Sequence, residues 1–212
     1  MPFDAVIFDL DGTLLDTEAM WGAGLERVLV RMGHPPAPGL IHSLVGIDHE
    51  QSRQRLAAAL PGLDVPAMEA TLFAEMSAEE ARGIALKAGV AELLAQLWGR
   101  KLPLAIATSS VRFRAHAKLE RSGLSSYFAT VVTRDCVTRA KPAPDAFLLA
   151  ARRLGVDPAR CLAFEDSDAG TRAAHDAGMY VVQVPDLVPP GTGLANVVAA
   201  DLLAGARSAG IV

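Results

Sequence analysis

The stretch AVIFDLDGT, residues 5–13, decides the fold of this chain. Its first four residues are apolar, which is typical of a short strand buried on both faces in a parallel sheet. Side chains alternate along an extended chain, so we expect Asp9 and Asp11 to point the same way, and Gly12 permits a sharp turn after them. The stretch therefore predicts a buried strand that ends in two converging acids.

A calcium-binding EF-hand loop is an alternative for this motif, because such loops also contain closely spaced aspartates and a glycine. That loop has its glycine at the sixth position and a glutamate at the twelfth, and a helix precedes it. Counted from Asp9, the glycine here is fourth and Met20 is twelfth. The pattern therefore disfavours a calcium loop.

Apolar runs of the same kind recur along the chain, at residues 102–107, 129–132, 161–164 and 180–184. Stretches with helical spacing lie between the later runs, each followed closely by a glycine suited to end a helix, at residues 113–121, 145–154 and 168–177. Alternating strands and helices with short connections predict right-handed crossovers between parallel strands. We therefore expect an α/β fold, a doubly wound parallel sheet with helices on both faces.

One segment interrupts this alternation between the first two predicted strands. It contains only helix-like stretches, at residues 18–32, 41–60 and 66–82, separated by pieces rich in proline and glycine. We therefore expect two domains, an α/β core formed by residues 1–15 and 84–212 and a helical cap formed by residues 16–83. The two crossings between them predict a hinge, and the glycine- and alanine-rich tail after Pro189 is expected to be loosely held.

Composition excludes several classes of protein. The chain has 212 residues, of which 51% are hydrophobic and 21% charged, so it is neither disordered nor fibrous. Its net charge of -4 provides no basic field for nucleic acid or an anionic membrane surface, and no apolar stretch reaches the ~18 residues of a membrane span. We expect a soluble, cytoplasmic monomer that acts on small molecules, with Cys136 and Cys161 as reduced thiols.

Residues able to bind ions directly follow two other predicted strands, or lie in the loop just before the helix at residues 145–154: Thr108, Ser109, Ser110, Glu165 and Asp166 in the first case, and Lys141 in the second. Each of them alone has an ordinary interpretation, as a helix cap or an exposed lysine. Together with Asp9 and Asp11 they fall at the carboxyl edge of the predicted sheet, where ligands bind in open α/β folds. Crowded carboxylates repel one another unless a hard cation lies among them, and oxygen ligands of this kind suit Mg²⁺.

These residues resemble the four motifs of the haloacid dehalogenase (HAD) superfamily of phosphotransferases, over about residues 5–184. In chain order the motifs are Asp9-Leu10-Asp11-Gly12-Thr13, Thr108-Ser109, Lys141-Pro142 and Glu165-Asp166. The helical insert, with Asp16-Thr17, Asp166-Ser167 and Gly170, resembles the branch that contains β-phosphoglucomutase and many sugar-phosphate phosphatases. The resemblance implies a Rossmann-like HAD core with the insert as a cap.

The resemblance implies that Asp9 is a nucleophile, which attacks phosphorus and forms an aspartyl-phosphate. It implies that Asp11 protonates the leaving oxygen and later deprotonates the incoming water. That role requires a pKa raised toward neutrality; the neighbouring Asp9 would raise the pKa of Asp11, and the metal would oppose this rise.

The resemblance also implies a ligand set for a cation and one for phosphate. Mg²⁺ would be held by Asp9, the backbone carbonyl of Asp11, Asp166 and Glu165, the last either directly or through one water. The oxygens of the phosphate would be held by Thr108, the Ser109 amide and Lys141.

Within the superfamily, the residues favour phosphate-ester hydrolysis. Dehalogenases need neither a second acid nor a metal, and family phosphonate hydrolases use a cap lysine, whereas this chain has no lysine before Lys87. β-Phosphoglucomutase has a histidine where Trp21 aligns and an arginine where His49 aligns. Substrate selectivity is expected to involve Trp21, His49, Arg53 and Ser110. Trp21 either stacks on a sugar or packs in the cap, and Arg53 either reads an anionic group or is solvated.

The sequence therefore predicts a Mg²⁺-dependent phosphatase that acts on a small phosphorylated metabolite, a sugar or polyol phosphate. A hexose-phosphate mutase resembling β-phosphoglucomutase is the enzymatic alternative. A non-catalytic phosphate-binding protein on the same fold is the alternative from another class, although the expected loss of a nucleophile, metal ligand or lysine is not found in the motifs.

Overall fold

The structure is a computed structural model of the chain and describes residues 3–35, 38–44 and 49–212. Its strands are β1 (Ala5–Phe8), β2 (Leu104–Ala107), β3 (Thr130–Val132), β4 (Cys161–Glu165), β5 (Tyr180–Gln183) and β6 (Val197–Val198). Its α-helices are α1 (Thr17–Arg31), α2 (Pro38–Leu44), α3 (His49–Ala59), α4 (Val65–Glu80), α5 (Val90–Gly99), α6 (Arg112–Arg121), α7 (Asp145–Leu154), α8 (Asp168–Asp176) and α9 (Leu202–Ser208).

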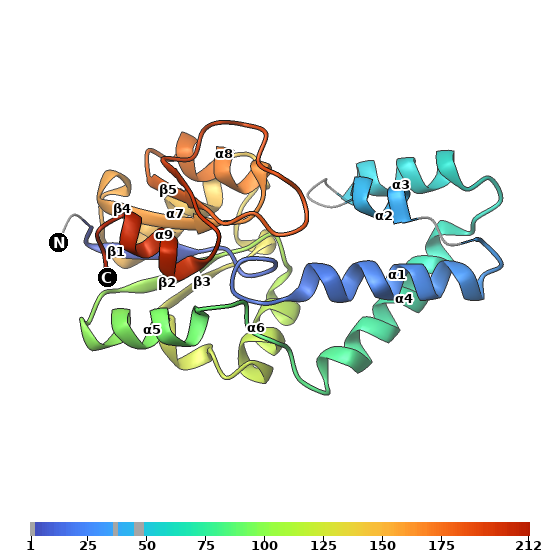
Figure 1. Ribbon diagram of the computed structural model, residues 1–212, viewed down its shortest axis with the longest axis horizontal. Coiled ribbons are helices and arrows are strands. Elements are labelled where there is room, and N and C mark those ends of the chain that lie inside the picture. The colour runs from blue at the N-terminus through green and yellow to red at the C-terminus, as the bar shows by residue number, and fades with distance from the viewer. Residues whose placement is uncertain (1–2, 36–37, 45–48) are drawn as a thin grey trace.

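The strands form one parallel sheet in the order β3-β2-β1-β4-β5-β6. Helices α7 and α8 cover one face of this sheet, and α5, α6 and α9 cover the other (Figure 1). The first strand shows how the sequence sets these layers, because Ala5 and Ile7 face α7 and α8 while Val6 and Phe8 face the opposite side. The predicted doubly wound α/β fold is confirmed.

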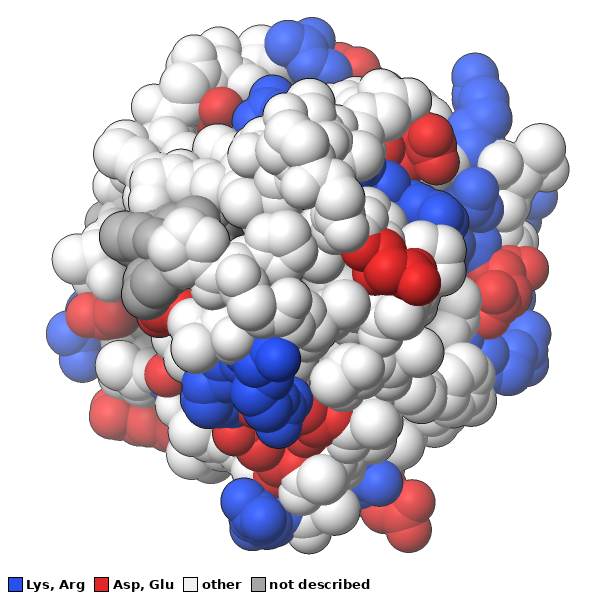
Figure 2. All heavy atoms as spheres, turned by 90° about the vertical axis from the view of Figure 1, so that its right-hand side faces the viewer, with Lys and Arg blue, Asp and Glu red and all other residues white. Residues whose placement is uncertain are grey.

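Helices α1 to α4, which we call the helical unit, lie between β1 and β2 in the chain and extend away from the carboxyl edge of the sheet (Figure 1). They have a core of their own, formed by Leu25, Val28, Leu29, Met68, Leu72 and Met76 among others. Charges of both signs lie interspersed over the end of the molecule that this unit forms (Figure 2). The helical unit is therefore a separate apolar cluster attached to the α/β layers.

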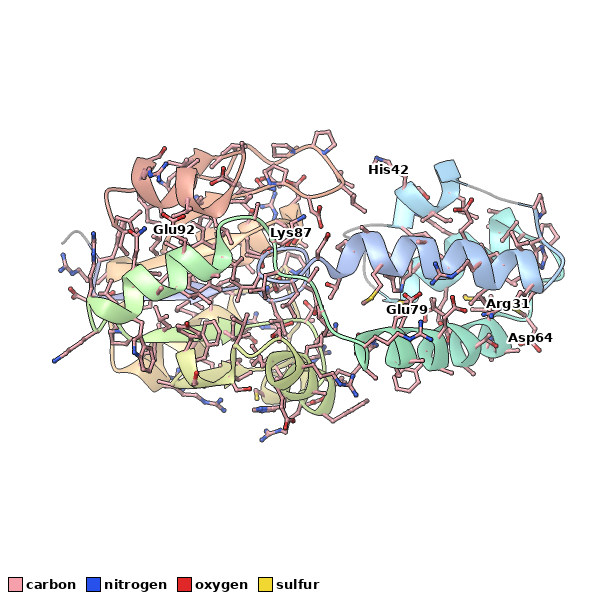
Figure 3. The ribbon with its side chains drawn as sticks, turned by 60° about the horizontal axis from the view of Figure 1, so that its bottom comes forward. Arg31, His42, Asp64, Glu79, Lys87 and Glu92 are labelled. Carbon is pink, nitrogen blue, oxygen red and sulfur yellow. The ribbon has the colours of Figure 1, made fainter. Side chains whose placement is uncertain are left out.

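The two connections to the helical unit run side by side. Asp16 N donates to Ala85 O at 2.9 Å, and Lys87 N donates to Leu14 O at 3.0 Å. Figure 3 shows Lys87 at the junction between the helical unit and the α/β layers, and its ammonium lies 2.6 Å from Asp186. The domain limits drawn from the sequence, 1–15 with 84–212 and 16–83, stay a prediction.

The structure differs from the sequence-based expectations in several elements. The single helix expected at residues 41–60 is described as α2 and α3, and residues 45–48 between them lie outside the described residues. The tail after Pro189 was expected to be loose, and this is wrong: it forms β6 and α9, because Leu202, Ala206 and Ile211 are buried in the core beside the sheet. Helix α5 was also missed, although its buried residues Val90, Leu93, Leu94 and Leu97 have helical spacing.

Two further expectations concern the surroundings of the chain. Among the described residues, no helix combines the length and the apolar character needed to cross a membrane. Cys136 and Cys161 are both free thiols, and Cys161 is buried at the start of β4.

Candidate active site

The centre of the site lies where β1 and β4 end side by side. These strands are paired with Phe8 opposite Phe164, so Asp9 and the pair Glu165 and Asp166 meet at the carboxyl edge of the sheet. Asp9 N donates to Phe164 O at 2.9 Å, which fixes the chain at this point. Carboxylate oxygens of Asp9, Glu165 and Asp166 all lie within 4.8 Å of one another.

Lys141 lies between two of these acids. It comes from the loop before α7, and its ammonium donates to Asp9 Oδ1 at 2.6 Å and to the Glu165 carboxylate. The same nitrogen lies 4.9 Å from the centre of the Phe147 ring, and the side chain is only 6% exposed. One buried cation therefore faces a nucleophile candidate and a metal-ligand candidate together.

The protonation of this cluster reflects its burial. Burial, with the nearby carboxylates of Glu165 and Asp11, raises the pKa of Asp9 to about 8, while Lys141 opposes the rise. Burial and the neighbouring charges of Glu165 and Asp9 also raise the pKa of Asp166 well above its usual range. These acids repel one another in the absence of a further positive charge, so the donor set suits a hard divalent cation such as Mg²⁺.

Glu165 is held rigidly by the start of α8. Its carboxylate accepts hydrogen bonds from Asp166 N at 3.2 Å, Ser167 N at 3.3 Å and Ser167 Oγ at 3.1 Å, and the residue is fully buried. Gly170, in the first turn of α8, leaves the space that this carboxylate fills, because a Cβ there would lie 1.8 Å from Glu165 Oε1. A glycine is therefore required at this position.

Asp166 is positioned by the turn that follows β1. Thr13 Oγ1 donates to Asp166 Oδ1 at 3.1 Å. Gly12 has a positive φ of 81°, and a Cβ at this position would lie 2.5 Å from Asp166 Oδ2. The glycine of the first motif thus serves both the turn and the close approach of a carboxylate.

Asp11 has a different set of partners. Its Oδ1 accepts from Lys118 Nζ at 2.5 Å and from Thr17 Oγ1 at 2.9 Å, and its Oδ2 accepts from Ser110 Oγ at 2.7 Å. Burial alone would raise the pKa of Asp11, but the Lys118 ammonium and the two hydroxyls outweigh it and lower the pKa. The expectation that the pKa of Asp11 is raised is therefore wrong, because a buried lysine from α6 and two hydroxyls stabilise the ionised carboxylate.

The motif at the end of β2 lies next to Asp11. Thr108 is only 2% exposed, and its hydroxyl accepts from Ser110 N at 3.0 Å, while Ser109 is exposed. Through its bond to Asp11, Ser110 connects this motif to the first one. The roles of Thr108, Ser109 and Ser110 in binding phosphate or a leaving group stay predictions.

The structure places the expected specificity residues on the helical unit. Trp21 is partly buried and packs against the core of this unit, as one of its two interpretations expects. Arg53 lies 3.7 Å from Glu69 of α4 and is 40% exposed. His49 begins α3, and its side chain lies outside the described residues. Their roles in selectivity stay predictions.

Two residues of the site were missed in the sequence. Lys118 shares the buried face of α6 with Ala115 and Leu119, so a lysine in an apolar helical stripe was the available signal. Glu18, in the first turn of α1, has its pKa raised to about 7 by burial and by the charges of Asp11 and Asp186. Its position directly after Asp16-Thr17 carried no separate signal.

Comparisons with known proteins agree with this geometry. Residues 6–184 match the family described as haloacid dehalogenase-like hydrolase. The chain is 36% identical over 185 residues to the fructose-1-phosphate phosphatase YqaB of Escherichia coli, covering 86% of this chain and 96% of that protein.

Two solved structures share the fold. A HAD family hydrolase from Deinococcus radiodurans, with bound phosphate and sodium, has a TM-score of 0.83 at 29% identity and covers 100% of this chain and 98% of its own. A putative β-phosphoglucomutase from Thermotoga maritima has a TM-score of 0.79 at 31% identity and covers 92% of this chain and 94% of its own. The chain therefore belongs to the haloacid dehalogenase-like hydrolases.

Proposed function

We propose that this chain is a Mg²⁺-dependent phosphatase that hydrolyses a small sugar or polyol phosphate through an aspartyl-phosphate on Asp9. The observation that carries the proposal is the position of Lys141, whose ammonium lies 2.6 Å from Asp9 and also contacts Glu165 in an acidic cluster. A phosphate monoester needs such a combination, because a nucleophile must approach phosphorus while positive charge offsets that of the phosphate oxygens. The similarity to a fructose-1-phosphate phosphatase supports the substrate class.

The first step transfers the phosphoryl group to the protein. An Asp9 oxygen forms a bond to phosphorus while the bond from phosphorus to the ester oxygen breaks. The electron pair of the broken bond stays on the leaving oxygen, which takes a proton from Asp11 and departs as an alcohol. Lys141, with Thr108 and the Ser109 amide, holds the remaining phosphate oxygens during this transfer.

The second step returns the protein to its starting state. Asp11, now ionised, removes a proton from a water molecule, whose oxygen attacks phosphorus as the bond to Asp9 breaks. Inorganic phosphate leaves, Asp9 is again a carboxylate, and Asp11 again carries the proton. The hydroxyls of Thr17 and Ser110 donate to Asp11 at 2.9 and 2.7 Å.

Asp9, Glu165 and Asp166 form a donor set that fits Mg²⁺, and the backbone carbonyl of Asp11 completes the proposed ligands. When bound, Mg²⁺ supplies positive charge that offsets the repulsion between the phosphate and the carboxylates. The solved relative with bound phosphate and sodium supports a site of this kind. The helical unit, as a cap, would carry selectivity through Trp21, His49 and Arg53.

A hexose-phosphate mutase is the second candidate, favoured by the similarity to the putative β-phosphoglucomutase. In that reaction the phosphoryl group on Asp9 passes to another sugar hydroxyl instead of to water. Trp21 and His49 stand where β-phosphoglucomutase has histidine and arginine, so hydrolysis remains the proposal.

The test measures phosphate release from a panel of sugar, polyol and glycolate phosphates, with Mg²⁺ or EDTA, for wild type and Asp9→Asn. Metal-dependent release that disappears in folded Asp9→Asn supports the proposal. Conversion of glucose 1-phosphate to glucose 6-phosphate without phosphate release would establish the mutase instead. Full activity in Asp9→Asn, with deamidation excluded by mass spectrometry, would remove the aspartyl-phosphate mechanism.

A further inference from the structure

Lys118 is a buried lysine that none of the four sequence motifs contains. It lies on α6, on the same face as Ala115 and Leu119, and its side chain is only 7% exposed. Burying an ammonium is unfavourable unless it is paired, so its partners decide what the residue does. Those partners are the Asp11 carboxylate at 2.5 Å and the Glu80 carboxylate at 3.9 Å.

The bonds around Asp11 distinguish its two oxygens. Oδ1 accepts from Lys118 and Thr17, at 2.5 and 2.9 Å, and both donors are buried. Oδ2 accepts from the Ser110 hydroxyl at 2.7 Å, and Ser110 directly follows Thr108 and Ser109 at the end of β2. Both oxygens are thus bonded to the protein, Oδ1 by two buried donors and Oδ2 by a single hydroxyl beside the predicted phosphate-binding residues.

Glu80 fixes the lysine from the other side. It is the last residue of α4, the helix that runs from the helical unit down toward α6 (Figure 1), and its side chain is 6% exposed. Besides Lys118, it faces Arg114 at 3.7 Å and Arg121 at 3.4 Å, both on α6. Glu80 therefore ties the end of the helical unit to the helix that carries Lys118.

We propose that Lys118 is a positioning residue that fixes Asp11 through Oδ1, so that Oδ2 exchanges the proton with the leaving oxygen and with water. The inference rests on the proposed hydrolysis and adds a residue to it. Lys118 takes no proton and touches no substrate. Its effect is to keep the Asp11 carboxylate in the one orientation that serves both steps.

A leaving-group comparison separates this role from a structural one. An alkoxide leaving group, as from fructose 1-phosphate, needs the proton from Asp11, whereas p-nitrophenolate is stable as an anion and departs without it. General acid catalysis contributes about 10²–10⁴-fold, and loss of its positioning removes part of that, so we expect Lys118→Met to slow first-turnover release of the sugar by about 10- to 100-fold. Release of p-nitrophenol from p-nitrophenyl phosphate in the first turnover should change little.

The matched control is Arg121→Met, which removes a cation facing the same Glu80 without touching Asp11. It should affect both substrates alike, and only as far as it affects folding. The second variant is Lys118→Arg, which keeps the charge that Asp11 and Glu80 require. Because its planar guanidinium donates in a different geometry from the compact ammonium, a smaller loss is expected, again confined to the sugar phosphate.

The experiment follows both products by quenched flow, with folding checked by circular dichroism. A slower first-turnover release from the sugar phosphate alone in Lys118→Met supports the proposal. If Lys118→Met does not fold, the same comparison is made with Lys118→Arg. Equal losses for both substrates, or no loss in whichever of the two variants is folded and used for the test, overturn the role of Lys118. Neither result contradicts the proposed phosphatase activity. A wild-type protein that releases neither product contradicts the hydrolysis itself, and the role of Lys118 with it.

Discussion

Replacing Gly170 by alanine tests how the acidic cluster is held. The added Cβ would lie 1.8 Å from Oε1 and 1.9 Å from Cδ of Glu165, which is fully buried. Displacing this carboxylate breaks its contacts with Lys141 and with the amides of Asp166 and Ser167. Lost hydrogen bonds to a charged group cost about 1.5–3 kcal/mol and overpacking about 1–3 kcal/mol, against about 1 kcal/mol gained in helix propensity. The free energy of unfolding should fall by about 1.5–5 kcal/mol on this reasoning.

Urea unfolding followed by circular dichroism measures this loss, with and without Mg²⁺. Gly99→Ala is the matched control, because Gly99 ends α5 and a Cβ there meets nothing within 4 Å. The control should leave stability unchanged or raise it by up to about 1 kcal/mol. A loss below about 1 kcal/mol in Gly170→Ala, within the spread of ordinary surface substitutions, would refute the argument that Glu165 is immovable.

Three further predictions address the charges of the site. Lys141→Met leaves Asp9 and Glu165 buried without their cation, so the free energy of unfolding should fall by about 3–5 kcal/mol in urea titrations without Mg²⁺. The kcat for phosphate release should fall about 10²–10³-fold, and near-normal release would contradict the proposed role of Lys141. The folded pKa of Asp9 is raised to about 8, so the folded chain binds more protons than the unfolded one between about pH 4 and 8. Asp9 therefore makes the metal-free fold less stable as pH rises, and Mg²⁺ should raise Tm more at pH 8 than at pH 5. An equal rise in Tm at both pH values would count against the proposed Mg²⁺ site. Gly12→Ala places a Cβ 2.5 Å from Asp166 Oδ2 at a φ of 81°, so calorimetry should show weakened Mg²⁺ binding, and an unchanged Kd would argue against Asp166 as a ligand.

The sheet was predictable apart from β6, because its other strands lie in short apolar runs. The run at residues 5–8 is buried at every position, and the motif that follows it emerges at the carboxyl edge for the same reason. The end of β4 was predictable in the same way, since Glu165 is the last residue of a fully buried strand and Asp166 follows it directly. Pattern and position were sufficient there because neighbouring parallel strands must end at the same edge.

The partners of Asp11 could not be predicted, because they depend on which helix faces lie together. Lys118 lies 107 positions after Asp11 in the sequence, and it interrupts an apolar stripe in its own helix. A lysine in such a stripe signals a buried charge without naming its partner. The direction of the Asp11 pKa shift depended on that partner, and the sequence-based expectation was therefore wrong.

Asp9 and Asp11, which are separated by one residue, thus have opposite pKa shifts, and neither shift suits the proposed role of its residue. Burial raises the pKa of Asp9 and so favours its protonated form, although a nucleophile must be ionised, and the pKa of Asp11 is lowered, which favours the ionised form although the first step needs its proton. Positive charge among Asp9, Glu165 and Asp166 favours the ionised form of Asp9. The charge of a phosphate ester beside Asp11 raises the pKa of Asp11 by like-charge repulsion. Both changes in pKa come from ligands, so the proposed reaction requires the cation and the substrate to be present together. Without them, neither Asp9 nor Asp11 is in the protonation state that the first step needs.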